Sequence, residues 1–279
     1  MIIRCWGARG SIPVSGNQYN KYGGDTTCIE IRTSEDDLLI IDAGTGIRNL
    51  GKLLVKEKRS HLHLLFTHAH LDHLMGLLFF APLFRSDVQI DVYGGAMANQ
   101  DFRTSLDTIW DEPYTPISLD EVKARLTFHE IENQTLQIGS VQIETIPLTH
   151  PNGGFGYKFI EQNKTFVFLT DNELSHSQSG LVSYQQYVDF CKNADLLIHD
   201  AEFTHIEYES KKGWGHSRML DALNLAIQAN VKQFGLFHHN QDRSDDALDA
   251  LVMECKNVIH EQPCLLECFA VAAGMQMTL

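Results

Sequence analysis

The sequence predicts an α/β protein of the mixed α+β kind, with two β-sheets packed face to face and helices on their outer faces. Three observations lead to this class. Strand-like apolar runs fall into two groups, helical patterns are interspersed among them, and no repeat or linker interrupts the 279 residues. We therefore expect one domain spanning residues 1–279, because a chain of this length buries enough apolar surface for a single large core.

The first group of strands lies in the N-terminal half. Residues 26–33 and 38–42 predict two neighbouring strands around a polar turn. Residues 47–58 place apolar side chains at helical spacing and end in basic residues, which predicts an amphipathic helix. Residues 62–66 form a short apolar run typical of a buried strand, and residues 74–84, apolar on nearly all sides, predict a buried helix.

The second half continues the same alternation of strands and helices. Strands are predicted at 88–93, 124–131, 141–148, 155–160, 165–169, 195–199 and 233–237, and amphipathic helices at 220–229 and 245–258. Residues 101–121 are expected to be a long irregular insertion. Such a segment can be a lid, a dimer contact or plain surface padding, and the sequence leaves these alternatives open.

Composition narrows the classes of function. With 22 basic and 36 acidic residues the net charge is −14, which disfavours a nucleic-acid partner because such binding depends on Lys and Arg neutralising phosphates. A phosphate substrate is still allowed, since bound divalent cations reverse the local field. No apolar run approaches the roughly 20 residues of a membrane span. Six scattered cysteines without a CxxC pair, and a start that resembles a strand rather than a signal peptide, lead us to expect a cytoplasmic protein that does not bind membranes.

The segment that follows residues 62–66 carries the chemistry. It reads Thr67-His68-Ala69-His70-Leu71-Asp72-His73, with four strong metal-ligand side chains in six positions between apolar segments. Strand alternation directs His68 and His70 the same way, and a turn into a helix can aim Asp72 and His73 elsewhere. The spacing therefore predicts two pairs of ligands for two adjacent metals. A solvated polar loop is the weaker alternative, because both flanks are apolar.

These residues resemble the HxHxDH signature of the metallo-β-lactamase superfamily. Further parts of the pattern occur in order and at strand ends: His150, Asp171 and His238 resemble the third-motif histidine, the bridging carboxylate and the last histidine ligand. The similarity extends over about residues 1–245. It implies the four-layer αββα sandwich of that superfamily.

The resemblance also implies the ligand set. His68, His70 and His150 would hold one metal, Asp72, His73 and His238 the second, and Asp171 would bridge them. Histidine and carboxylate ligands without thiolate favour two zinc ions, with manganese or iron tolerated. Whether His238 or the adjacent His239 is the ligand stays open. Asp42 resembles a support residue behind the histidine loop, with a helix N-cap or turn role as the alternative.

Two later segments resemble the phosphodiesterase branch of the superfamily, which includes ribonuclease Z. Asp200 and Glu202 follow one predicted strand, and Gly215-His216-Ser217 precedes a predicted helix. The resemblance implies that His216 contacts the scissile phosphate and protonates the leaving oxygen, with Asp200 or Glu202 orienting it. Asp72 would both bind metal and accept a proton from the nucleophile. Ser217 is also a candidate helix N-cap, and Arg218 stands where ribonuclease Z usually has threonine.

The substrate class follows from charge and from what the chain lacks. Ribonuclease Z proteins carry a long basic arm, whereas residues 171–199 contain only a short loop at 175–180 without a Lys/Arg cluster. We therefore expect a small phosphodiester such as a cyclic nucleotide, with tRNA 3′ processing and a non-catalytic metal or nucleotide sensor as the alternatives. A homodimer is an expectation from similar proteins only.

The glycine-containing loops at 7–11, 22–26 and 153–154 rim the pocket or are ordinary turns. Six histidines match no motif and are expected to be surface or structural residues: His61, His63, His129, His176, His205 and His260.

Overall fold

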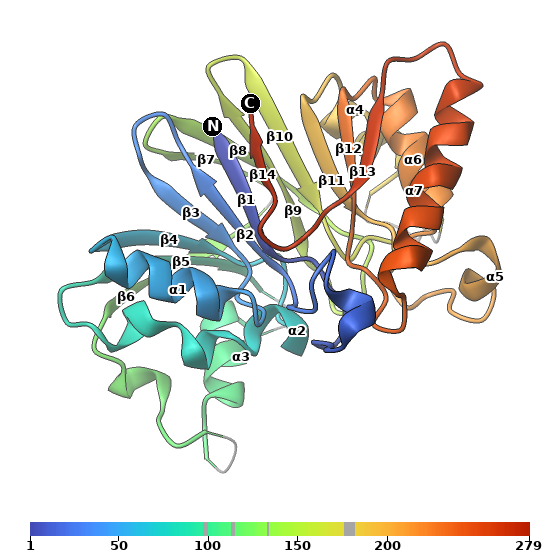
Figure 1. The fold of residues 1–279 in the computed structure, drawn as a ribbon. Coiled ribbons are helices and arrows are strands. Elements are labelled where there is room, and N and C mark those ends of the chain that lie inside the picture. The colour runs from blue at the N-terminus through green and yellow to red at the C-terminus, as the bar shows by residue number, and fades with distance from the viewer. Residues whose placement is uncertain (97–99, 113–114, 133, 176–181) are drawn as a thin grey trace.

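The computed structural model of the chain describes residues 1–96, 100–112, 115–132, 134–175 and 182–279. Its strands form two mixed sheets of seven strands each. The first sheet has the order β14-β1-β2-β3-β4-β5-β6 and the second the order β13-β12-β11-β10-β9-β8-β7. The predicted sandwich of two sheets with outer helices is confirmed (Figure 1).

The first sheet and its helices come from the N-terminal half plus the last strand. Its strands are β1 (Ile2–Gly7), β2 (Cys28–Arg32), β3 (Leu38–Ile41), β4 (His61–Leu65), β5 (Gln89–Gly95), β6 (Arg125–Ile131) and β14 (Gln276–Thr278). The helices of this half are α1 (Ile47–Lys56), α2 (Leu71–Leu74) and α3 (Phe102–Ile109). Side chains on β4 explain the layering: Leu62 and Leu64 pack in the same cluster as Leu50 of α1, whereas Leu65 joins the core between the sheets.

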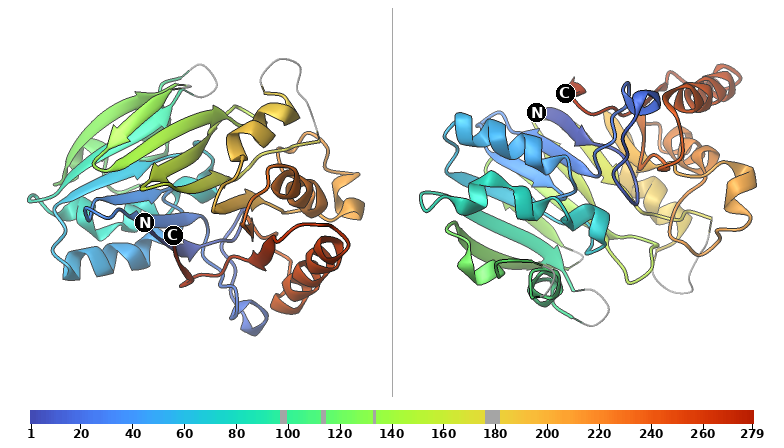
Figure 2. Two further views of the ribbon diagram at one scale, coloured as in Figure 1. Left: turned by 90° about the horizontal axis from the view of Figure 1, so that it is seen from above. Right: turned by 60° about the horizontal axis from the view of Figure 1, so that its bottom comes forward.

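The second sheet has its own helical cover. Its strands are β7 (Thr135–Ile138), β8 (Val141–Pro147), β9 (Phe155–Glu161), β10 (Lys164–Leu169), β11 (Leu196–Asp200), β12 (Gln233–Phe237) and β13 (Glu267–Ala270). The helices of this half are α4 (Tyr184–Cys191), α5 (His205–Tyr208), α6 (Met219–Gln228) and α7 (Asp245–His260). Leu223 of α6 and Leu251 of α7 pack with Leu197 of β11 on the outer face, while Phe166 and Phe237 fill the space between the sheets. The left view in Figure 2 shows the green strands of this sheet over the blue strands of the first, with α1 beyond them.

Most predicted elements are confirmed, with boundaries shifted by a few residues, but residues 74–84 do not form one helix. Helix α2 ends at Leu74, and two short 3-10 turns follow, Leu77–Phe79 and Ala81–Phe84. Gly76 lies so close to Gly44 that an added Cβ would be 2.0 Å from the Gly44 carbonyl oxygen. This contact and Pro82 at the start of the second turn break the helical path.

The insertion at 101–121 is more regular than expected. Asp101 caps α3 by accepting a hydrogen bond from the Thr104 amide. Phe102, Leu106 and Trp110 are buried in the apolar cluster on the outer face of the first sheet. Plain surface padding is therefore wrong for this part of the segment, and residues 113–114 lie outside the described part. The lid and dimer-contact roles remain predictions.

The strand directions also determine at which edge of each sheet the candidate site residues gather. Strands β3 to β6 run parallel to one another, as do β10 to β13. Residues that follow the carboxyl ends of parallel strands gather at one edge of a sheet, where ligands bind in many α/β proteins. Within the described residues, no helix is both long and apolar enough to cross a membrane.

Candidate metal centre

The predicted site residues follow the carboxyl ends of strands in both sheets. His68 comes three residues after β4 and Asp171 two residues after β10, while Asp200 ends β11 and His238 directly follows β12. The helical turn of α2 then carries Asp72 and His73. The structure brings all seven predicted ligands together with Asp200, Glu202 and His216 at this edge of the sandwich.

Three residues that follow strand ends at the site have a strained backbone conformation. Asp42, Asp171 and His238 have φ angles of 61°, 52° and 54°, in the left-handed region that non-glycine residues seldom adopt. Each stands where a strand ends and the chain turns sharply. Such conformations persist only where the surrounding contacts compensate for their cost, and they cluster at functional sites.

One group of ligand atoms comprises His68, His70, His150 and Asp171, whose candidate atoms all lie within 4.8 Å of one another. The Asp171 Oδ2 atom lies 3.6 Å from His68 Nε2 and 3.7 Å from His150 Nε2. His70 Nδ1 lies 2.9 Å from His150 Nε2. Burial lowers the pKa of His150 to about 4 and holds the pKa of His68 well below its ordinary value. Neutral imidazoles are the form that binds metal.

A second group faces the other oxygen of the same carboxylate. Asp171 Oδ1 lies 3.3 Å from His73 Nε2 and 3.4 Å from His238 Nε2. Asp72 Oδ2 lies 3.5 Å from His73 Nε2 and 3.2 Å from His238 Nε2. Asp171 therefore presents one oxygen to each group. This arrangement would allow the carboxylate to bridge two ions, with one oxygen on each.

Two properties of these side chains indicate that the two groups are suited to bind divalent cations. Among the described residues, the Nε2 atoms of His68 and His73 are buried without any hydrogen-bond partner. They lie 3.6 and 3.3 Å from oxygens of Asp171 without a hydrogen bond, and a buried polar atom without a hydrogen bond is costly. Several carboxylates are also buried around them: Asp42, Asp72, Asp171, Asp200 and Glu202. Buried charges are paired or coordinate metals in stable proteins, so the His/Asp clusters are consistent with a dinuclear metal site.

Carboxylates behind the ligands orient two of the imidazoles. Asp42 Oδ2 lies 2.8 Å from His73 Nδ1, and Asp42 Oδ1 accepts a hydrogen bond of 2.8 Å from the Thr67 amide. Glu202 Oε2 lies 3.0 Å from His238 Nδ1. Such contacts direct the remaining Nε2 atom of each ring toward the site. The N-cap alternative for Asp42 is wrong, because Gly46 occupies that position of α1.

The adjacent residues His238 and His239 have different environments. His238 belongs to the second group, whereas His239 Nε2 lies 2.7 Å from the Val271 carbonyl oxygen and takes part in neither group. Burial lowers the pKa of His239 to about 3, so this ring donates its proton to the carbonyl as a neutral imidazole. The structure thus favours His238 of the two.

His216 lies beside both groups and is paired with a carboxylate. Its Nδ1 atom lies 2.7 Å from Asp200 Oδ2 and 3.5 Å from Glu202 Oε2. Its ring stacks on His238 at 4.7 Å between centroids and lies 5.2 Å from the His150 ring. Burial by itself lowers the pKa of His216, but Asp200 and then Glu202 outweigh it and raise this pKa to about 9. The carboxylates of the chain therefore favour a protonated His216.

Comparison with known proteins agrees with this geometry. The family described as Beta-lactamase superfamily domain matches residues 38–239. The chain belongs to the metallo-β-lactamase superfamily. It is 27% identical to Ribonuclease Z of Listeria welshimeri over 246 residues, which covers 72% of this chain and 78% of that protein.

Solved structures with the same fold superpose over nearly the whole chain. The metallo-β-lactamase fold protein YhfI from Bacillus subtilis has a TM-score of 0.71 at 20% identity and covers 99% of both chains. A diphosphatase from the PhnP family has a TM-score of 0.67 at 14% identity, covering 100% of this chain and 97% of its own. With its His/Asp clusters, this superfamily member has the equipment of a metal-dependent hydrolase.

The superfamily motifs did not reveal Glu173, which organises the loop before His216. Its carboxylate accepts hydrogen bonds of 2.8 Å from the amides of Gly213 and Gly215. Gly215 has a φ of 92°, and its carbonyl oxygen lies 2.9 Å from His150 Nδ1. An added Cβ at Gly215 would be 2.0 Å from that ring. The only signal in the sequence was the position of Glu173 two residues after Asp171.

The structure also tests two smaller expectations, one for Ser217 and one for the loop at 7–11. The N-cap alternative for Ser217 is wrong, because Arg218 occupies the N-cap of α6 and Ser217 Oγ instead donates to the Asn172 carbonyl oxygen at 2.5 Å. The loop at 7–11 does border the site, since the Ser11 amide donates a hydrogen bond of 2.8 Å to Asp72 Oδ2. The short loop at 175–180 lies mostly outside the described residues.

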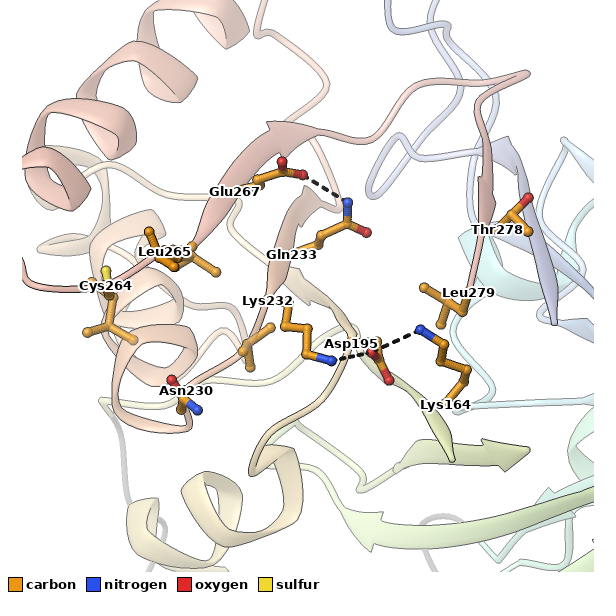
Figure 3. Close-up of a pocket in the computed structure, with 13 residues that line it drawn as sticks. Lys164, Asp195, Asn230, Lys232, Gln233, Cys264, Leu265, Glu267, Thr278 and Leu279 are labelled. Carbon is orange, nitrogen blue, oxygen red and sulfur yellow. Dashed lines mark hydrogen bonds and ion pairs between the residues drawn. The ribbon is translucent and has the colours of Figure 1, made fainter. Parts of the chain in front are cut away.

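A cavity of about 590 Å³ lies at the opposite edge of the second sheet (Figure 3). It is lined by residues at the starts of β10 to β13, whereas the metal-binding groups follow the ends of strands. Asp195 lies 2.7 Å from Lys232 Nζ and 3.6 Å from Lys164 Nζ, so the two lysines share its charge. Paired in this way, they offer little to an anionic ligand. The two groups of candidate metal ligands of this superfamily member lie at the other edge, which follows the strand ends.

Proposed function

We propose that the protein is a dinuclear metal-dependent phosphodiesterase acting on a small phosphodiester such as a cyclic nucleotide. The observation that carries the proposal is the Asp200–His216 pair, which lies against two adjacent groups of metal-binding side chains. A phosphodiester needs charge neutralisation at phosphorus and a proton for the leaving oxygen. The site contains residues suited to both tasks.

The proposed ligand set uses the two groups described above. His68, His70 and His150 would hold one ion, Asp72, His73 and His238 the other, and Asp171 would bridge them. When bound, the two cations, zinc on this donor set, supply the Lewis acidity that activates water and neutralises phosphoryl oxygens. The chain contributes the placement of these donors.

The remaining steps belong to side chains of the protein. Asp72 is placed to accept the proton of the nucleophile, and its Oδ2 atom is anchored by the Ser11 amide. His216 is placed to donate a proton to the leaving oxygen, because its Nδ1 atom is engaged by Asp200 and Nε2 remains for the substrate. Asp200 keeps the ring in that orientation, while Glu202 orients mainly His238.

A small substrate is supported by the charge of the chain. The net charge of −14 opposes binding of a long polyanion, whereas one phosphodiester needs only the local field of the metal centre. The names of these two similar proteins, Ribonuclease Z and a diphosphatase, both refer to cleavage at phosphorus. We therefore place the protein among phosphodiesterases rather than among hydrolases of lactams or thioesters.

The second candidate is a ribonuclease Z-like endonuclease that processes the 3′ end of tRNA. It is favoured by the 27% identity to Ribonuclease Z over most of both chains. A non-catalytic metal or nucleotide sensor is the third, and it is disfavoured because a sensor has no need of the Asp200–His216 pair.

A panel of substrates on the metal-loaded protein separates these candidates. We expect hydrolysis of an aryl phosphodiester and of a cyclic nucleotide, and no turnover for Asp72→Ala, which removes a ligand and the proton acceptor together. Cleavage of precursor tRNA at the discriminator base, with no turnover of small esters, would replace the first proposal by the second. Tight nucleotide binding without turnover would favour the sensor.

A further inference from the structure

A second histidine cluster lies at the start of β4, away from the metal centre that follows its end. His61 and His63 share one face of β4, and Asp91 of β5 stands beside His63 in register. His129 of β6 joins them through Asp91. None of these residues belongs to the superfamily motifs described above.

The position of the cluster in the sandwich is unusual for polar residues. Its side chains occupy the face of the first sheet that points to the second, the face on which Leu65 and Ile131 are buried further along β4 and β6. At this corner the inner face carries imidazoles and a carboxylate instead of apolar groups. Asp91 is only 8% exposed, so its charge requires nearby compensation.

The geometry of the cluster resembles an open metal site. One candidate ligand atom from each of His61, His63 and Asp91 lies within 4.8 Å of the other two. Asp91 Oδ2 lies 2.6 Å from His61 Nε2, and the His61 and His63 rings are 4.6 Å apart between centroids. Ligand atoms on a tetrahedral zinc with bonds of about 2.1 Å are roughly 3.4 Å apart. To reach this spacing, the 2.6 Å contact between His61 and Asp91 has to widen and separations of up to 4.8 Å have to shorten. The His61 side chain, 54% exposed, is free to make this adjustment.

The surroundings favour a cation and leave room for its remaining ligands. His61 and His63 line a surface cavity of about 580 Å³ that is open to water. The charged residues lining it comprise three carboxylates and two cationic groups: Asp36, Asp37, Glu57, Lys58 and Arg59. Asp36 is paired with Arg59 at 2.6 Å and Glu57 with Arg32 at 2.9 Å. Among the described residues that line the cavity, this leaves Asp37 as the carboxylate without an ion pair, and its charge acts on His63. The second oxygen of Asp91 lies 2.9 Å from His129 Nε2, a contact that orients the carboxylate from behind.

We propose that His61, His63 and Asp91 form a separate binding site for one divalent transition-metal ion, zinc in the first instance, which links β4 to β5. Two imidazoles and a carboxylate are borderline donors that suit zinc and bind copper(II) more tightly still. Water from the cavity completes the coordination. The ion replaces the hydrogen bond between His61 and Asp91 and joins neighbouring strands at a corner of the sandwich, so its role is structural.

Zinc binding to chelator-stripped protein tests the proposal. Equilibrium dialysis with elemental analysis is expected to show one zinc per chain fewer in the double variant His61→Gln/His63→Gln than in the wild type. His260→Gln, which removes an exposed histidine at the end of α7, serves as the matched control and is expected to keep the wild-type count. Equal zinc content in the double variant and the wild type would overturn the proposal. Because only the difference counts, the result is independent of how many ions the main centre holds.

A second measurement uses the unaltered chain and so does not depend on how the variant folds. Chelator-stripped protein first receives two equivalents of zinc for the main centre, one equivalent of copper(II) is then added for the site at the start of β4, and the electron paramagnetic resonance spectrum is recorded. We expect hyperfine splitting from two imidazole nitrogens on the added copper. A spectrum of copper ligated by oxygen alone would contradict the site, because His61 and His63 would then remain unused.

Discussion

The two ends of β4 carry histidine clusters in opposite surroundings. His68 and His73, after the strand, are almost fully buried, and Asp42 and Asp171 orient or face their nitrogens. His61, at the start, is an exposed side chain beside an open cavity. The comparison teaches that histidine spacing alone does not make a catalytic centre. Strained strand ends, several buried carboxylates instead of the single Asp91, and the Asp200–His216 pair distinguish the end of β4 from its start.

The largest effect is expected where the two groups of the main centre meet. Asp171→Ala removes the carboxylate that faces four histidines through its two oxygens. We expect phosphodiester turnover to fall by at least roughly 10³-fold, because both proposed ions lose a shared ligand and can no longer activate water together. Turnover is measured on an aryl phosphodiester at saturating metal, with circular dichroism as the control for folding. A loss below about tenfold would remove the distinction between the two ends of β4.

The next effect separates the proposed proton donor from the proposed metal ligands. His216→Gln is expected to lower kcat by roughly 10²–10⁴-fold on substrates with an alkoxide leaving group, which need protonation. Substrates that release nitrophenolate need no proton, so their loss should stay below about tenfold. Asp200→Asn is the matched variant and should show the same dependence on the leaving group, since Asp200 Oδ2 lies 2.7 Å from His216 Nδ1. Equal losses on both substrates would assign His216 to metal or substrate binding instead.

A smaller effect is expected from the carboxylate behind His238. Glu202→Gln keeps the side-chain size but weakens the contact with His238 Nδ1, 3.0 Å away. We expect metal affinity to fall by roughly 10–100-fold, with kcat largely restored at saturating metal. Metal titration followed by activity measures both quantities. A loss of kcat that metal does not restore would place Glu202 with Asp200 in proton transfer.

The smallest effect is expected at the start of β4. The double variant His61→Gln/His63→Gln should keep phosphodiester turnover within about twofold of the wild type, because residues without shared partners act independently. Its thermal unfolding temperature, measured with and without zinc, should lose the zinc-dependent increase that this site contributes. A large loss of turnover would show that the two clusters are coupled through β4.

Part of the fold and of the candidate site could be predicted from the sequence. Whether a feature could be predicted depends on whether local sequence or distant contacts determine it. The HxHxDH segment is local, so His68 to His73 and the candidate ligands at later strand ends could be predicted from their motifs. The sandwich followed from strand patterns, but β7, β13 and β14 are four residues or shorter and give little periodicity. The break in residues 74–84 depends on Gly76 packing against Gly44, a contact 32 residues away in sequence.

Contacts between distant segments explain what the sequence could not reveal at the site. Glu173 accepts from two amides of the loop before His216, about forty residues later in the chain, and no spacing rule predicts such a contact. The sequence left open whether Asp200 or Glu202 orients His216, and the structure divides the two carboxylates between His216 and His238. The cluster of His61, His63 and Asp91 likewise depends on the register of β4 with β5.

Titration of the chelator-stripped His61→Gln/His63→Gln variant with zinc, followed by hydrolysis of an aryl phosphodiester, tests the central claim most directly. This variant lacks the site at the start of β4, so the added metal is counted at the main centre alone. The account predicts that turnover rises until two equivalents of zinc per chain are bound and then levels off. Turnover that saturates at one equivalent, or no phosphodiester hydrolysis by the fully loaded protein, would contradict it.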